Sequence, residues 1–145
     1  LYKAACLLHD TTWKAHPDYR AEMSFETVTR TNLGGINHGG RIFLALALMS
    51  RYKKMHISKD LEVPLRILGE SRAEEAITLG RAMRLGAMVS GTSSVNLKKC
   101  NLFVKNQILY LNLRKSGQDL GAGIVERRLK AVADSMNLNY SLRIS

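Results

Sequence analysis

Residues 40–54 contain the longest apolar run of the chain, IFLALALM at positions 42–49. A helix built from this run is apolar nearly all round and has no polar face to turn toward water. Such a helix needs neighbours on every side, which predicts that it lies in the middle of a helical bundle. The run is shorter than the roughly 20 residues of a membrane-spanning helix, so we expect a soluble protein without a membrane segment.

The flanking segments supply the neighbours that a central helix needs. Apolar residues at helical spacing predict further helices over residues 1–9, 20–31, 60–68 and 71–91. Pro64 should interrupt the third of these, because proline cannot donate a helix hydrogen bond. Ser71 and Glu74 fit a capping box at the start of the fourth, and Gly91 should end it.

The pattern changes from helix to strand after residue 94. Apolar or alternating runs predict strands over residues 97–104, 108–114 and 138–144. The first two lie around Lys105-Asn106-Gln107, a length that suits a hairpin loop. Between the second and third strands, a final helix is expected over residues 122–136, and Asn137 should end it.

This order of elements predicts an α+β protein that is predominantly α. We expect one domain, with a helical bundle over residues 1–92 and a small antiparallel β-β-α-β subdomain over residues 93–145 packed on it. The chain enters at LYKAACLL, inside a helical pattern and without methionine, so we expect a fragment of a longer protein. Cys6 and Cys100 match no Cys-x-x-Cys spacing, which favours a reduced, cytoplasmic protein.

The chain is strongly basic, and the excess is unevenly distributed. Its 22 Lys and Arg against 12 Asp and Glu give a net charge of +10. Nine basic and three acidic residues lie in positions 97–145. Such a field attracts polyanions such as polyphosphate, nucleotides, nucleic acid or an acidic partner. A solvated basic surface with no specific ligand is the alternative.

His9 and Asp10 end the first predicted helix, and this stretch resembles the HD metal phosphohydrolases. Imidazole and carboxylate groups suit Mn²⁺, Fe²⁺ or Mg²⁺. The resemblance implies an HD-like bundle in which a later helix carries another carboxylate, whereas that helix here reads RAMRLG at residues 81–86. Because cations repel a metal ion, we expect no metal site and no catalytic residue; His9 and Asp10 are degenerate candidates that cap or pack the helix end.

Several ordered segments carry a second resemblance that spans nearly the whole chain. They are ACLLHDTTWKAHPDYRAEMSF from residue 5, SRYKK from residue 50, RAMRLG from residue 81 and VERRLKAVADSMNLNYSLRI from residue 125. Together they resemble the C-terminal helical region of the exopolyphosphatase / guanosine pentaphosphate phosphohydrolase family.

This resemblance implies a larger parent enzyme with two amino-terminal lobes of the actin-like ATPase fold. In the family, those lobes bind magnesium and use a carboxylate to activate water. They release orthophosphate from the end of polyphosphate or convert guanosine pentaphosphate to the tetraphosphate. The C-terminal domain is implied to be non-catalytic, to need no cofactor, to hold polyphosphate and to form a homodimer, with the parent's lobes as its other partners.

Basic residues in the matching segments are the candidates for polyanion binding. They are Lys14, His16, Arg20, Arg51, Lys53, Lys54, Arg81 and Arg84. Spaced cations can hold phosphates without reading bases. Local structural roles are the alternative: Arg20 as a solvated first turn, Arg51 and Lys53 complementing a helix C-terminus, and Arg81 facing acids.

Two other functions stay open at this point. An active HD-type nucleotide phosphohydrolase would need ligands upstream of Leu1 and a metal-binding role for groups such as His16 or Asp18. A basic nucleic-acid-binding module would need a recognition motif or an aromatic-rich strand, and the sequence shows neither, so we expect no specific nucleic acid. The chain also lacks a phosphate-binding P-loop and a nucleophile elbow.

Overall fold

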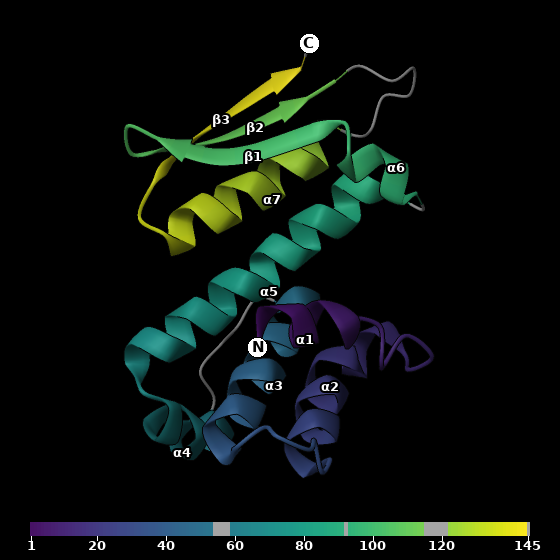
Figure 1. Ribbon diagram of the computed structural model, residues 1–145, viewed down its shortest axis with the longest axis vertical. Helices are drawn as coiled ribbons and strands as arrows, with labels where there is room; N and C mark the ends of the chain where they lie inside the picture. The colour runs from purple at the N-terminus through teal and green to yellow at the C-terminus, as the bar shows by residue number, and fades with distance from the viewer. Residues whose placement is uncertain (54–58, 92, 115–121, 145) are drawn as a thin grey trace. The chain divides into compact units, whose positions relative to one another are not determined.

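The computed structural model describes residues 1–53, 59–91, 93–114 and 122–144 (Figure 1). The elements run in the order α1 (Tyr2–Leu7), the 3-10 helix η1 (Pro17–Tyr19), α2 (Arg20–Arg30), α3 (His38–Tyr52), α4 (Lys59–Leu68), α5 (Glu70–Ser90), α6 (Ser94–Leu97), β1 (Cys100–Lys105), β2 (Ile108–Leu113), α7 (Ala122–Ser135) and β3 (Asn139–Ile144). The predicted class, α+β and predominantly α, is confirmed.

The chain forms two compact units, Leu1–Met83 and Arg84–Ser145. The boundary lies inside α5, so that helix contributes residues to both units. The first unit is helical and the second contains the sheet. The expected division at residue 92 follows the change of sequence pattern and stays a prediction, as does the packing of the second part on the first.

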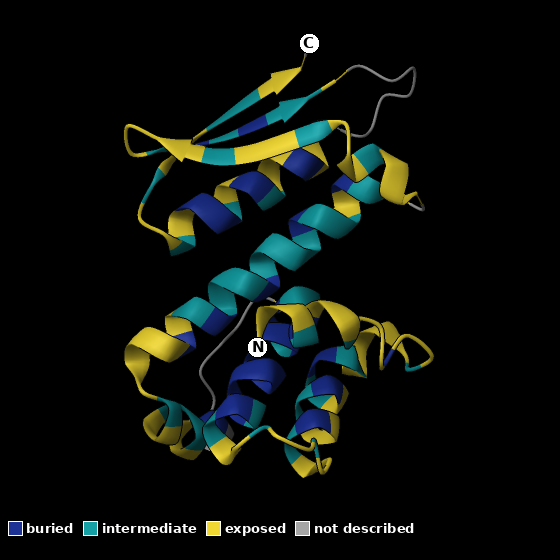
Figure 2. Cartoon of the chain, viewed as in Figure 1, coloured by how far each residue is buried: buried dark blue, intermediate teal, exposed yellow. Residues whose placement is uncertain are grey.

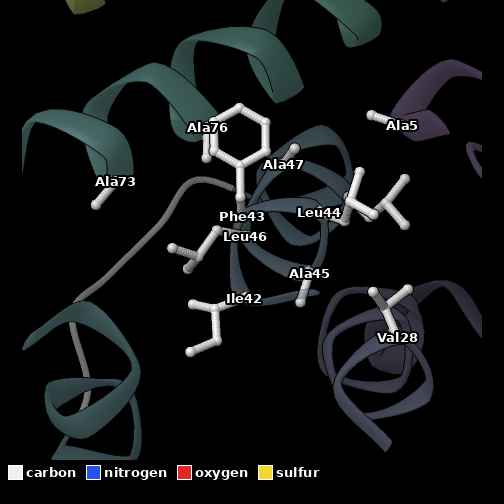
Figure 3. Packing of buried hydrophobic residues seen from close by; sticks show 11 residues of the cluster. Ala5, Val28, Ile42, Phe43, Leu44, Ala45, Leu46, Ala47, Ala73 and Ala76 are labelled. Atoms are coloured by element: carbon white, nitrogen blue, oxygen red, sulfur yellow. The ribbon is translucent and has the colours of Figure 1, made fainter. Parts of the chain in front are cut away.

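The core of the first unit surrounds α3. Every residue from Ile42 to Leu48 is buried, and the side chains of Phe43, Leu44 and Leu46 point away from the α3 axis in different directions (Figures 2 and 3). Ala5 of α1, Val28 of α2 and Ala73 and Ala76 of α5 join the same cluster. This arrangement confirms the central helix that the apolar run predicts. No helix in the described ranges is long and apolar enough to cross a membrane.

The helix ends follow local chemistry, with two corrections to the sequence predictions. Asn37 caps α3 by accepting a hydrogen bond from Gly40 N at 2.8 Å. The capping box is wrong, because Ser71 is the second residue of α5; the helix follows directly on Gly69, whose φ is +83°. Pro64 lies inside α4 and does not interrupt it. Gly91, with φ +56°, follows the last residue of α5, as predicted.

The sheet has the order β1-β2-β3 and is mixed. β1 and β2 are antiparallel and joined at Asn106 and Gln107, whose φ values of +50° and +60° match a two-residue type I′ turn. β3 pairs parallel with β2, so the antiparallel expectation is wrong for the third strand. The reason is α7, which connects β2 to β3 and carries the chain back to the end of the sheet where β2 begins. β3 therefore starts at the same end as β2 and runs in the same direction. β1 begins at Cys100, because residues 94–97 form α6.

One face of the sheet is covered by α7 (Figure 1). Leu109 and Leu111 of β2 are buried, and so is the apolar stripe of α7, made of Val125, Leu129, Val132 and Ala133. Asn137, with φ +53°, lies in the turn that ends α7, as predicted. The second unit therefore has its own apolar core between the helix and the sheet.

Gly80 provides a test of how closely α5 approaches α3. A Cβ added there would lie 2.7 Å from Ser50 Cβ and would also meet Ala47 O. We expect Gly80→Ala to lower the free energy of unfolding by about 1–3 kcal/mol, because these atoms must move apart. Urea denaturation of the purified variant measures this change.

Gly86→Ala is the matched control in the same helix, because a Cβ there meets no atom within 4 Å. It should raise the free energy of unfolding by about 0.5–1 kcal/mol through the better helix propensity of alanine. Equal effects of the two substitutions would contradict the close contact at Gly80.

Candidate functional site

His9 and Asp10 lie in the turn that follows α1, and oxygen atoms of the protein face both nitrogens of the imidazole ring. His9 Nδ1 lies 2.8 Å from the carbonyl oxygen of Cys6. Nε2 lies 3.3 Å from Asp10 Oδ2. Both imidazole nitrogens of His9 therefore face atoms of the same turn. His9 and Asp10 do not point together toward a position for a metal ion.

The end of α3 completes this arrangement. The guanidinium of Arg51 donates to Asp10 Oδ1 at 3.1 Å, and the arginine side chain is only 12% exposed. The Tyr52 hydroxyl donates to the carbonyl oxygen of His9 at 2.8 Å, and the Arg51 guanidinium lies over the Tyr52 ring. A positive charge is thus already bound to Asp10, and it repels any second cation at that carboxylate.

The donor set at this turn does not fit a metal ion. A catalytic zinc site has three protein ligands and an open position for water. Within the described ranges, no three His, Cys, Asp or Glu side chains gather in a group that could hold one. The His9-Asp10 pair is better explained as part of the contact between the α1 turn and α3.

Lys53 is also neutralised within the first unit. Its ammonium donates to Glu22 Oε1 of α2 at 2.6 Å. This hydrogen bond holds the pKa of the Glu22 carboxyl below its ordinary value, against partial burial, which raises the pKa. Lys54, the next candidate cation, lies outside the described residues.

The loop between α1 and α2 carries two further candidates, Lys14 and His16, and a third, Arg20, is the first residue of α2. Arg20 donates through Nε to Ala15 O at 2.9 Å and through a terminal nitrogen to Trp13 O at 2.7 Å, so it closes the loop. His16 Nδ1 accepts from the backbone of Asp18 at 3.4 Å, where it caps η1. Lys14 is exposed and lies over the Trp13 ring. Of these three candidates, Lys14 and His16 are exposed and Arg20 is partly buried.

Arg81 and Arg84 are partly buried on α5, and both already take part in interactions within the protein. They lie three residues apart on the helix, in different units of the chain. Of the eight candidates, the structure thus places Lys14 and His16 in the loop that Arg20 of α2 closes, and Arg51 and Lys53 at the end of α3.

The structure also forms a basic cavity whose residues are not among the eight candidates. It lies in the second unit at one end of the β1-β2 hairpin, with a volume of about 330 Å³. Its lining residues are Lys98, Lys99, Cys100, Asn101, Asn112, Leu113 and Arg114. Strand register is the signal that could have found it, because counting back from the hairpin turn pairs Cys100 with Leu113 and brings Lys99 and Arg114 together.

Comparison with known proteins gives one family. Residues 1–139 match the family described as exopolyphosphatase, C-terminal. A search of curated proteins found no match. The matched region includes both the α1 turn with its Arg51 contact and the basic cavity of the second unit.

The ion pair of Asp10 and Arg51 should contribute measurably to stability. Asp10→Asn leaves the largely buried guanidinium without its charged partner, so we expect the free energy of unfolding to fall by about 1–3 kcal/mol. Asp18→Asn is the matched control, because Asp18 is 81% exposed and only approaches His16 at 3.6 Å. It should change stability by less than about 0.5 kcal/mol. Urea denaturation distinguishes the two, and equal losses would contradict the role of Arg51.

The pair of Glu22 and Lys53 should make stability depend on pH. Glu22 has a lowered pKa in the folded protein, so its contribution is present above the pKa of the unfolded chain and is lost as pH falls through the folded pKa. Both side chains are about half exposed, so Lys53→Met should cost no more than about 1 kcal/mol at pH 7. The difference from the unsubstituted protein should shrink as pH falls below the ordinary pKa of a glutamate and through the lowered pKa of Glu22. A difference that grows in acid would contradict this pairing.

Proposed function

Because the chain belongs to the exopolyphosphatase C-terminal family, we propose that it is the non-catalytic, substrate-holding domain of an exopolyphosphatase. In this proposal, hydrolysis and the magnesium that it uses belong to amino-terminal lobes of the parent enzyme. The present chain binds the polyanionic substrate, polyphosphate or guanosine pentaphosphate, and keeps it near those lobes. Homodimer formation is a second role that the same domain would serve.

The observation that carries the non-catalytic role is the contact between Arg51 and Asp10. In an HD-type hydrolase, the His-Asp pair must present its imidazole and carboxylate to a metal ion. Here a guanidinium lies 3.1 Å from the carboxylate, and both imidazole nitrogens face oxygen atoms of the protein. Metal-assisted hydrolysis at this turn would require these contacts to break first.

The charge of the chain supports the substrate-holding role. Its net charge of +10 gives a field that attracts polyphosphate, whose phosphates carry closely spaced negative charges. Lysine and arginine hold phosphate oxygens by charge-assisted hydrogen bonds, which need no sequence readout. Within the first unit, Lys14 and His16 are exposed candidates for this contact, whereas Arg20, Arg51 and Lys53 already donate to oxygens of the protein.

Calorimetry across a salt series tests the substrate-holding role. We expect long-chain polyphosphate to bind the chain and to lose about 10- to 50-fold in affinity between 50 and 200 mM salt, as expected when three or four charges are neutralised. Tripolyphosphate and single-stranded RNA of matched charge serve as competitors. Preference for long polyphosphate over RNA supports the proposal, and equal binding of both would contradict it as generic electrostatics.

Two companion measurements separate the remaining roles. Elemental analysis after metal loading should find no stoichiometric metal, and Asp10→Asn should not change the metal content. Stoichiometric metal that is lost in Asp10→Asn would indicate an active HD-type phosphohydrolase instead. A stable dimer by analytical ultracentrifugation, together with no polyphosphate binding, would reduce the role of the domain to dimerisation.

A further inference from the structure

The cavity at the end of the β1-β2 hairpin concentrates positive charge where the strands leave the sheet. Lys98 and Lys99 precede β1, and Arg114 follows β2. The backbone N–H of Arg114 donates to Lys99 O at 3.1 Å, one residue beyond the register pair of Cys100 and Leu113. This bond ties the two strand ends together, so the hairpin register brings the backbones of Lys99 and Arg114 side by side.

No carboxylate of the hairpin balances this charge. Neither residues 93–114 nor residues 139–144 contain Asp or Glu. The described acidic residues of the unit are Glu126 and Asp134, both on α7, and Asp134 pairs with Lys130 at 2.8 Å. No ion pair joins Lys98, Lys99 or Arg114 to any residue in the described ranges. This situation contrasts with the first unit, where Arg51 and Lys53 each bind a carboxylate.

Asn112, one of the lining residues, also has a buried side-chain oxygen that lacks a partner. Asn112 Oδ1 is shielded from solvent and accepts no hydrogen bond from the described residues. A buried acceptor without a donor costs roughly 1–3 kcal/mol. Turning the terminal amide of Asn112 by 180° exchanges its oxygen and nitrogen, which would place two N–H donors where Oδ1 now lies. Asn101, the register partner of Asn112, lines the cavity beside it.

The chemistry of the lining distinguishes a phosphate chain from a nucleic acid. Single-stranded nucleic acids bind where bases can stack on aromatic rings. None of the described lining residues is aromatic. The nearby Tyr110 already stacks on Phe103, with ring centroids 5.2 Å apart, and the Arg143 guanidinium lies 4.5 Å from the Tyr110 centroid. The lining therefore offers cations and amides for oxyanions and no ring for a base.

We propose that the cavity lined by Lys98, Lys99, Arg114, Asn101 and Asn112 is a binding site for a short segment of a phosphoric anhydride chain. The proposal rests on the proposed function and assigns polyphosphate contact to the sheet unit, outside the candidates in the α1 turn, α3 and α5. The two strand ends would hold phosphate oxygens through Lys99 and Arg114, while the asparagine amides donate to the same group. A volume of about 330 Å³ lies at the lower end of the range for small-ligand pockets.

A matched pair of double variants tests the site. Lys99→Gln with Arg114→Gln removes two charges from the cavity. Lys105→Gln with Arg127→Gln removes the same two residue types from the same unit, at positions that do not line it. We expect the first pair to weaken long-chain polyphosphate binding at least 10-fold by calorimetry and the second pair less than 2-fold. Circular dichroism confirms folding, and Lys99→Arg with Arg114→Lys, which keeps both charges, should retain binding.

A second measurement locates the ligand without substitutions. Pyrophosphate titrated into the ¹⁵N-labelled chain should shift the amide signals of Lys99, Asn101, Asn112 and Arg114 before others. Equal losses of polyphosphate affinity in the two double variants, with amide shifts spread over the whole basic surface, would contradict a site in this cavity. The substrate-holding role of the domain would be unaffected by that result. No polyphosphate binding by the unsubstituted chain would overturn the proposed function, and localised pyrophosphate shifts in that case would still support an oxyanion site.

Discussion

The all-round burial of α3 is the constraint on which the first unit depends. A helix with apolar side chains at every position from 42 to 49 is unstable in water, and its burial on all sides is the main source of stability in this unit. The surrounding helices α1, α2 and α5 contribute small residues such as Ala5, Ala73 and Ala76, which let their backbones approach closely. Gly80 is buried against the α3 backbone for the same reason.

This packing also determines which contacts His9 and Asp10 make at the α1 turn. Once α3 is central, its last turn carries Arg51 and Tyr52 to His9 and Asp10, where they bind the carboxylate and the backbone. An arginine ion pair stabilises the contact between the two segments, whereas a metal ion would need the same oxygen atoms. At this end of α3, the helical unit thus uses Arg51 for an internal contact, and Lys53 with Glu22 does the same.

The sheet unit distributes its charge differently. Its strands contain Lys, Arg and Asn but no acidic residue, and its described acidic side chains lie on α7. Cations that share no carboxylate keep their full field for an external anion. The contrast between the two units explains why the number of basic residues alone is a poor guide to a binding site: what matters is which cations the fold has already neutralised.

The sequence by itself determined the helical core, most of the element positions and the excess of positive charge. These features depend on residues within one helical turn or one strand, as in the apolar run of α3 or the left-handed residues Gly91 and Asn137. Only the tertiary structure decided that β3 runs parallel to β2 and that Arg51 binds Asp10. Those pairings join residues distant in sequence, so they depend on how the elements pack, which local patterns do not encode.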